Sequence, residues 1–371
     1  MKLLCAKASH FKNCQDDTVI DLVAKSKKTT EDKEYELQEI AEGLYVYSIG
    51  AFVGKNASGK TTALELLDCC YDILGKFSLE NKHYSYEGIK LEIIFFHEGH
   101  VYKYATELKA DPTLANRATF SNQHIYKKKY YKTKLSSLYT EDFVEQKNLG
   151  ELPEDTASTF FVLKKKRVSA IFFGSDGMGV DTYQMAFRLL KTYHIPDEML
   201  SAIIRIFDSN IQSIQMLDEH NYRVNICNQE KLLSDKELLY MLSSGTTKGI
   251  ILYTLVVASL QQGFDLLIDE AEAHFHKTLV ENMLSLYMDK TVNRHGATLL
   301  FSTHYCEVLD LFNRQDNIWV CQSSDKIAIK NMYECFEVRS GLLKSKRFYN
   351  NAFQTAVNYD ELMNLKRKLM K

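Results

Sequence analysis

The apolar and polar positions of the N-terminal part predict strands followed by a helix. Residues 2–8 and 18–24 have the pattern of short strands. Residues 44–53 form a longer β-branched and aromatic run that ends at Gly54. Apolar residues then recur at helical spacing between residues 63 and 74. The predicted order is therefore strand, glycine-containing loop and helix.

The pattern of the remaining chain predicts an α/β fold with a largely parallel sheet. Residues 90–96 and 101–107 are strand-like runs around a short segment that contains Gly99, which favours a hairpin. The pattern weakens over residues 111–196, and we interpret that stretch as an inserted subdomain. Beyond it, a hairpin is followed by helices that alternate with apolar strands. These elements are expected at residues 211–217, 222–227, 242–260, 264–268, 277–289 and 297–301.

The glycine-containing loop matches the pattern G-x-x-x-x-G-K-[ST]. Its glycines allow backbone N–H groups to converge on phosphate oxygens, and the following helix N-terminus adds partial positive charge. Lys60 is expected to neutralise the β and γ phosphates, and Thr61 to offer its hydroxyl to Mg²⁺. A glycine turn that only caps a helix is the alternative. The expected nucleotide-binding residues are Gly54, Lys55, Asn56, Ala57, Ser58, Gly59, Lys60, Thr61 and Thr62.

Two acidic residues follow the predicted strand at residues 264–268, as in a Walker B segment. Asp269 is expected to hold Mg²⁺, directly or through water. Glu270 is expected beside the γ-phosphate, where a carboxylate can orient or deprotonate the attacking water. An apolar strand that ends in Asp-Glu is common by itself. The preceding phosphate loop favours the catalytic interpretation.

Two further segments have the residue types of a nucleotide site. Residues 242–246 read Leu-Ser-Ser-Gly-Thr before a buried helix, and Ser243 and Gly245 at a helix N-terminus suit a phosphate. A simple helix cap is the alternative. The strand at residues 297–301 leads to His304, whose neutral imidazole is able to hydrogen-bond a γ-phosphate. A structural histidine is the alternative there.

These motifs in this order resemble the bacterial AAA-type ABC ATPases related to the OLD, RloA and PtuA proteins. The resemblance rests on the loop at residues 54–60, the signature at residues 242–246, and Asp-Glu-Ala-Glu at residues 269–272 followed by His276. SMC and RecF proteins are more distant relatives. The resemblance implies an ABC-type P-loop NTPase head with N-terminal β elements. Residues 111–196 match only in position, and we expect a mainly helical insertion there.

The resemblance also implies how the motifs act. Two chains would pack head to tail around two ATP molecules, with Ser243 and Gly245 of one chain facing the γ-phosphate bound by the other. Mg²⁺ would lie between Thr61 and Asp269, and Glu270 and His304 would act in hydrolysis. The signature departs from that of transporters at its third position, where Ser244 replaces glycine. Gln123 is a candidate for the glutamine loop.

The resemblance further implies an antiviral role. Members of this group often act beside a nuclease or toxin in bacterial defence against phage. Residues 317–320 are predicted to form the last core strand, and the residues after it are too few for a fused Toprim nuclease. We therefore expect an ATPase that controls a separate effector, as a dimer or larger homo-oligomer. The expected parts are an N-terminal lobe at 1–110, a variable subdomain at 111–210 and a C-terminal lobe at 211–371.

Composition narrows the possible partners. Lys and Arg total 46 and Asp and Glu total 48 among the 371 residues, so no global field draws the chain to nucleic acid or anionic lipid. No apolar stretch approaches the roughly 20 residues of a membrane helix, and the N-terminus has no signal-peptide pattern. A cytoplasmic protein is expected. The eight cysteines are scattered without a C-x-x-C pair, which indicates ordinary thiols.

A local basic segment leaves an alternative function open. Residues 126–134 interleave five lysines, from Lys127 to Lys134, with three tyrosines. This pattern is able to bind phosphate backbones and stack on bases, although a solvated face is the simpler interpretation. The alternative function is a DNA-binding ATPase of the RecF or SMC kind in repair. The nucleotide-binding subunit of a transporter is a further rival, which the signature sequence disfavours.

Overall fold

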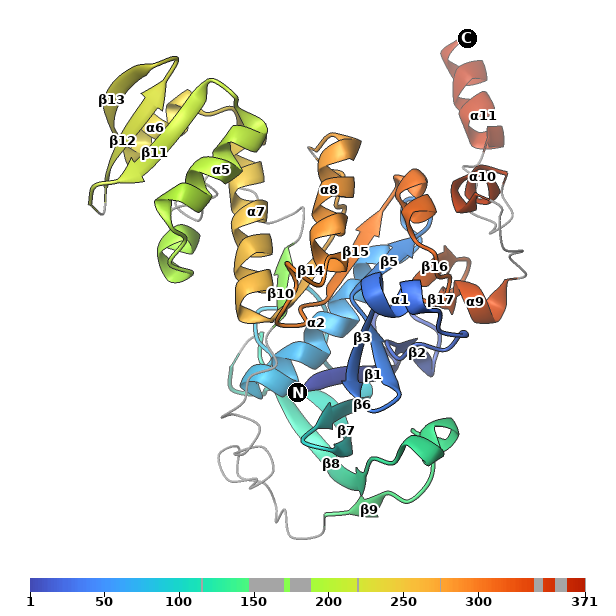
Figure 1. Cartoon of the computed structure of the whole chain (residues 1–371). Coiled ribbons are helices and arrows are strands. Elements are labelled where there is room, and N and C mark those ends of the chain that lie inside the picture. The colour runs from blue at the N-terminus through green and yellow to red at the C-terminus, as the bar shows by residue number, and fades with distance from the viewer. Residues whose placement is uncertain are drawn as a thin grey trace. The chain divides into compact units, whose positions relative to one another are not determined.

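The computed structural model describes residues 1–114, 116–146, 170–173, 188–218, 220–273, 275–336, 343–350 and 359–370. The chain forms two compact units (Figure 1). Unit 1 contains Met1–Ser169 and Phe301–Lys371, and unit 2 contains Ala170–Leu300. The compact units divide the chain at other positions than residues 110 and 210, and the three-part division expected from the sequence stays a prediction.

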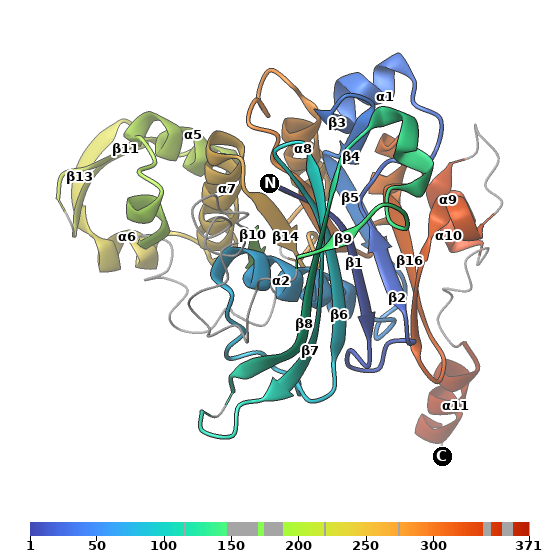
Figure 2. The ribbon, with the colours of Figure 1, turned by 90° about the horizontal axis from the view of Figure 1, so that it is seen from below.

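Unit 1 contains an antiparallel sheet with the strand order β2-β1-β6-β7-β8-β9 (Figure 2). The predicted hairpin is confirmed: β6 pairs with β7 so that His97 faces His100. Glu98 and Gly99 between them have φ values of 45° and 74°, as a tight turn between two strands requires. The strands are β1 (Lys2–Ser9), β2 (Thr18–Asp21), β6 (Lys90–His97), β7 (His100–Ala110), β8 (Ala118–Lys129) and β9 (Val144–Glu145).

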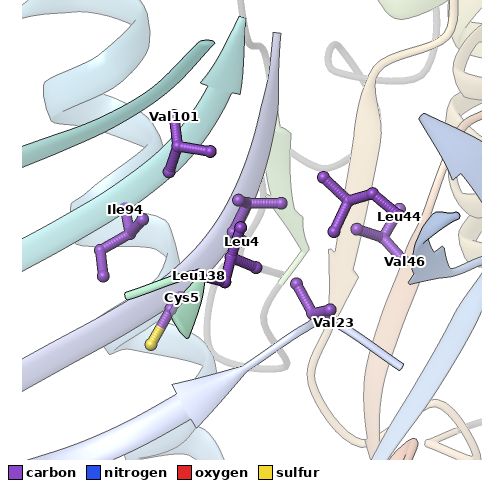
Figure 3. Packing of buried hydrophobic residues seen from close by; sticks show 8 residues of the cluster. All are labelled: Leu4, Cys5, Val23, Leu44, Val46, Ile94, Val101 and Leu138. Carbon is purple, nitrogen blue, oxygen red and sulfur yellow. The ribbon is translucent and has the colours of Figure 1, made fainter. Parts of the chain in front are cut away.

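One face of this sheet packs into a core of apolar side chains that come from distant parts of the sequence (Figure 3). Residues 3–6 of β1 and residues 93–95 of β6 are buried without a break, and because successive side chains of a strand point to opposite faces, both faces of the sheet are covered there. The cluster includes Leu138, which follows the 3₁₀ helix η1 (Lys132–Ser137). The residues drawn are Leu4, Cys5, Val23, Leu44, Val46, Ile94, Val101 and Leu138.

The apolar run at residues 44–53 is divided between two sheets rather than forming one strand. β4 (Leu44–Tyr47) pairs antiparallel with β3 (Leu37–Ala41). β5 (Ile49–Val53) pairs in parallel with β16 (Ile318–Ser323). Between them, the fully buried Ser48 donates its backbone N–H to the Glu36 carbonyl at 2.8 Å. Each half of the run has its own partner, which the sequence pattern does not reveal.

The helix α2 (Lys60–Lys76) follows β5 and buries an apolar stripe along its length. In the strand order, β5 lies between β15 (Leu299–Thr303) and β16, and β17 (Ile327–Asn331) follows β16. β17 is antiparallel to β16, so residues 317–320 are not the last strand of the chain. The remaining elements of unit 1 are α1 (Thr30–Tyr35), η3 (Cys306–Leu311), α9 (Met332–Cys335), α10 (Lys344–Tyr349) and α11 (Tyr359–Leu369).

Unit 2 combines a parallel strand pair with a small antiparallel sheet. β10 (Ala170–Phe173) pairs in parallel with β14 (Asp265–Ile268), which confirms the α/β expectation together with the β5–β16 pair. The predicted hairpin is also confirmed, and a third strand joins it. The other elements are α5 (Asp197–Phe207), β11 (Ile211–Met216), β12 (Asn221–Ile226), β13 (Gln229–Ser234), α6 (Asp235–Met241), α7 (Ser244–Gln262) and α8 (Lys277–Met288).

The segment at residues 111–210 differs from the expected helical insertion where the structure describes it. The longest described element of this segment is the 12-residue strand β8. The helix α5, which has 11 residues, lies at the end of the segment and belongs to unit 2. β8 ends in Tyr126 and three lysines, and most of its residues are partly buried, as in a half-exposed strand that pairs with β7. The glycine-rich stretch at residues 174–179 and the basic run at residues 164–167 lie outside the described residues.

A buried ionic network joins the N-terminal part of unit 1 to the segment before β16. Arg314 is 3% exposed and donates from Nε to Asp316 at 2.8 Å and from Nη1 to Asp32 at 3.0 Å. Asp316 also accepts the backbone N–H groups of Lys25 and Ser26 at 2.8 Å. Burial opposes ionisation of Asp316, but Arg314 and these N–H groups outweigh it and hold the pKa of Asp316 below its usual value.

No helix among the described residues is long and apolar enough to cross a membrane.

Replacing Arg314 with Met is expected to lower the free energy of unfolding of unit 1 by about 3–5 kcal/mol, because buried Asp316 and Asp32 would lose their cation. Urea unfolding followed by fluorescence of Trp319, the single tryptophan of the chain, measures this loss. Arg117→Met is the matched control. Its ion pair with Glu80 is partly exposed and should contribute less than about 1 kcal/mol. Equal losses in both variants would contradict the assigned role of the network.

Candidate functional site

The loop between β5 and α2 is shaped by two glycines that leave no room for a side chain. A Cβ atom on Gly54 would overlap Ser58 Oγ and lie 2.5 Å from the carbonyl oxygen of Cys321 on β16. Gly59 has a φ of 98°, and a Cβ atom there would overlap the side chain of Ile327 on β17. The loop backbone is therefore held against two neighbouring strands.

Lys60 folds back over this loop. Its side chain is largely buried, and Nζ donates hydrogen bonds to the carbonyl oxygens of Gly54 and Lys55, both at 3.1 Å. These bonds place a positive charge inside the ring of backbone formed by the loop. Burial raises the pKa of the Cys321 thiol to about 12, so β16 adds no negative charge beside the ammonium group.

The loop has the features that a bound phosphate requires. Ser58 is buried, and its Oγ has no hydrogen-bond partner among the residues that the structure describes. Thr61 is exposed in the first turn of α2, whose N-terminal N–H groups carry partial positive charge. A backbone cradle, a lysine and a free buried hydroxyl together fit a nucleotide phosphate. Asn56 and Ala57 are exposed at the tip of the loop, while Thr62 is buried in α2.

His304 follows directly after β15, the neighbour of β5 in the strand order. The side chain is half-buried, and its carbonyl oxygen accepts the N–H of Cys306 at 3.0 Å. The preceding residue, Thr303, accepts the N–H of Tyr305 through Oγ1 at 2.9 Å. These bonds fix a tight turn directly after β15, so His304 lies at the end of the strand, where the sequence places it.

In unit 2, the two predicted acids follow the fully buried strand β14. Asp269 is 5% exposed, and its N–H donates to the Phe173 carbonyl at the end of β10 at 2.9 Å. Glu270 adopts a φ of 51°, a left-handed conformation that costs a non-glycine residue about 1–2 kcal/mol. Such strain gathers at functional sites, where it fixes the direction of a side chain. The turn continues with Ala273 N–H donating to the Glu270 carbonyl at 2.7 Å.

The signature segment begins the helix α7 in unit 2. Ser243 is the N-cap residue, and its Oγ accepts the backbone N–H of Thr246 at 3.0 Å. Gly245 lies in the first turn, where the nearest atom to an added Cβ would be Ser243 Oγ at 3.8 Å. The helix N-terminus is therefore capped and open on the side of Gly245. Ser243 has the structural role that we considered as the alternative, and a capped helix start remains able to face a phosphate.

Other candidates bond to neighbouring groups within unit 1. Gln123 accepts a hydrogen bond from the Tyr104 hydroxyl at 2.8 Å within the β7–β8 pair. Lys128 donates to the carbonyl oxygens of Ser137 at 2.8 Å and Glu141 at 3.0 Å. Lys132 and Lys134 form ion pairs with Glu42 and Asp142.

Metal ligation by histidines is not supported where the chain is described. No group of three or more His, Cys, Asp or Glu side chains that could hold a metal ion occurs among the described residues. His276 instead caps α8 by accepting the N–H of Thr278. The cysteines with described positions are free thiols, as the sequence indicates.

Two parts of the loop environment were not predicted. The Cys321 carbonyl and the Ile327 side chain press against the two glycines, although they are more than 250 positions away in the sequence. Nothing in the apolar pattern of β16 or β17 distinguishes these residues from ordinary strand residues.

No family model and no curated protein matches the sequence. The structure is similar to an SMC head domain from Thermotoga maritima at 14% identity and a TM-score of 0.43, covering 89% of this chain and 99% of that chain. It is also similar to an SMC head bound to the C-winged helix domain of ScpA, at 10% identity and a TM-score of 0.45, covering 91% and 100%. Both TM-scores are below 0.5, so we infer no activity from these likenesses.

Replacing Ser243 with Ala should destabilise the start of α7 by about 1 kcal/mol, because the Thr246 N–H loses its acceptor. Ser243→Asp should restore the cap, since aspartate is an equally good N-cap residue. Amide hydrogen exchange in the first turns of α7 measures the change. Equal protection in the Ala variant and the unmodified chain would contradict the capping role.

Proposed function

We propose that this chain is a Mg²⁺-dependent ATP hydrolase of the ABC type. The observation that carries the proposal is the loop between β5 and α2, where Lys60 lies over a backbone cradle that only glycine permits at positions 54 and 59. This arrangement precedes a 17-residue helix whose N-terminus favours anions. Simple helix capping does not require a buried lysine bonded to the loop carbonyls.

The site residues divide into binding and catalytic groups. ATP phosphates would be bound by residues 54–62, with Lys60 turning from the loop carbonyls to the β and γ phosphates. Thr61 and Asp269 would hold Mg²⁺, which neutralises charge on the phosphates when bound. Glu270 would orient or deprotonate the attacking water, and its restricted backbone would limit the directions of its carboxylate. His304 would hydrogen-bond the γ-phosphate.

We further propose a head-to-tail dimer that encloses two ATP molecules. Ser243 and Gly245 of one chain would face the nucleotide bound by residues 54–61 of the other chain. Support comes from the start of α7, which is capped by Ser243 and open beside Gly245. A helix N-terminus with free space beside it suits the approach of a phosphate from another chain.

The biological role that we propose is control of a separate effector, a nuclease or toxin, in cytoplasmic defence against phage. This part rests on the resemblance to the OLD, RloA and PtuA group. The alternative, a DNA-binding ATPase in repair, depends on the basic segment at residues 126–134. There, Lys128, Lys132 and Lys134 already bond to carbonyl or carboxylate oxygens of the same chain. This engagement favours a structural role for the segment, so effector control is the function that we prefer.

Lys60→Ala should weaken ATP binding by on the order of 100-fold, because hydrogen bonds to a charged group contribute about 1.5–3 kcal/mol. Isothermal titration with ATP and Mg²⁺ measures the affinity. Lys76→Ala, at the other end of α2, is the matched control and should bind like the unmodified chain. Unchanged affinity in the Lys60 variant would refute nucleotide binding at this loop.

Glu270→Gln should lower the turnover number by about 10²–10⁴-fold while ATP still binds, because the amide cannot accept the proton of water. The ATP-bound dimer should then accumulate, which analytical ultracentrifugation with ATP detects. Glu281→Gln on α8 removes a carboxylate from the same unit, where it pairs with Lys277, and should not change turnover. Normal hydrolysis by the Glu270 variant would remove that carboxylate from the mechanism.

A further inference from the structure

An aromatic side chain at the end of α5 meets the signature helix at a position where no side chain fits. α5 and α7 lie side by side in both views (Figures 1 and 2). A Cβ atom on Gly249 of α7 would overlap the ring of Phe207 and lie 2.6 Å from its Cε2 atom. The ring therefore sits directly on the backbone of α7, less than two turns after the cap residue Ser243.

The same ring contacts the segment that follows the Walker B acids. Phe207 and Phe275 have ring centroids 6.0 Å apart, and Phe207 meets Tyr253 edge-on at 5.4 Å. Phe275 and Tyr253 are both buried, at 8% and 5% exposed. Phe207 thus fills the space between α7 and the residues that lead from Glu270 to α8.

Short-range bonds extend this contact in both directions. The Tyr253 hydroxyl donates to the Leu279 carbonyl in the first turn of α8 at 2.9 Å. Phe275 N–H donates to the Glu272 carbonyl at 3.0 Å, which ties the ring contact to the turn that begins at Glu270. The signature helix and the catalytic turn are consequently joined through one packed group, Phe207, Tyr253 and Phe275.

Close packing means that a movement of α7 is transmitted through this group to the turn after Glu270. A displacement of α7 cannot be absorbed at Gly249, because the Phe207 ring already touches the helix backbone. The displacement has to move the ring, and the ring is in contact with Phe275 and Tyr253. A flexible side chain such as methionine at this position would change its rotamer instead and would not transmit the movement.

We propose that Phe207 is a positioning residue that couples the two ATP sites of the dimer. The inference rests on the proposed function, in which the signature faces the partner's nucleotide while Glu270 of the same chain faces its own. Occupation of one site then shifts α7, and Phe207 passes the shift to the turn that directs Glu270. The consequence is cooperative hydrolysis.

The test is the ATP dependence of hydrolysis, measured at a protein concentration at which the ATP-bound chain is dimeric. The unmodified protein should have a Hill coefficient approaching about 2, the limit for two sites. In Phe207→Ala it should fall to about 1, while binding of a fluorescent ATP analogue to residues 54–62 is retained. Phe207→Leu, which keeps more of the packed volume, should give an intermediate value and provides a variant that folds if the Ala variant does not.

A control and a double variant separate coupling from general destabilisation. Phe264→Ala removes a buried ring of unit 2 that packs on Tyr193 and does not belong to the link, so the Hill coefficient should stay near 2. Gly249→Ala should also lower the coefficient, because the new methyl group displaces the Phe207 ring. With Phe207→Ala already present, Gly249→Ala should cause no further change.

The outcomes distinguish this inference from the function beneath it. A Phe207→Ala protein that hydrolyses ATP with an unchanged Hill coefficient overturns the coupling role, and so does a non-cooperative unmodified enzyme. Both results leave the ATPase proposal intact. Absence of ATP binding by the unmodified chain removes the ATPase proposal and the coupling with it. A loss of cooperativity in Phe264→Ala equal to that in Phe207→Ala would assign the effect to lost stability.

Discussion

The close approach of β16 and β17 to the loop after β5 is the constraint on which the candidate nucleotide site depends. Gly54 lies against the Cys321 carbonyl and Gly59 against the Ile327 side chain, so any larger residue would force the loop away from the strands. The Lys60 ammonium lies over this loop, bonded to the carbonyl oxygens of Gly54 and Lys55. A phosphate is the ligand class that this combination of charge and main chain suits.

The buried ionic network of unit 1 supports the same region from the other end of β16. Arg314, Asp316 and Asp32 bring the segment before β16 against the N-terminal part of the chain. Asn317, directly before β16, accepts the N–H of Ala51 on β5 at 3.0 Å. The network thus sets the start of the β5–β16 pair, whose other end carries the loop. Charges buried in this way stabilise a fold only when each has its partners.

In unit 2, the candidate site residues lie at the ends of a strand and a helix. The strain of Glu270 arises where β14 stops and a tight turn begins, and the cap of Ser243 lies where α7 starts. The aromatic group around Phe207 connects these two ends, which are separated in sequence by the whole of α7 and β14. The Phe207 ring lies directly against the backbone of α7 at Gly249, so α7 has little freedom to move independently of the ring. For this reason we assign the coupling to this contact.

The sequence by itself determined the local elements and the chemistry-bearing motifs. The spacing of apolar residues and the positions of glycine predicted the β6–β7 hairpin, α2 and the strand that precedes Asp269, because these signals lie in neighbouring residues. Tertiary structure decided the rest: the division of residues 44–53 between two sheets, the strand β17 behind Gly59, and the strand β8 inside a segment that was expected to be mainly helical. Each of these features depends on a contact between residues that are far apart in the sequence. An apolar pattern indicates that a residue is buried, but it does not indicate which strand or helix the residue contacts.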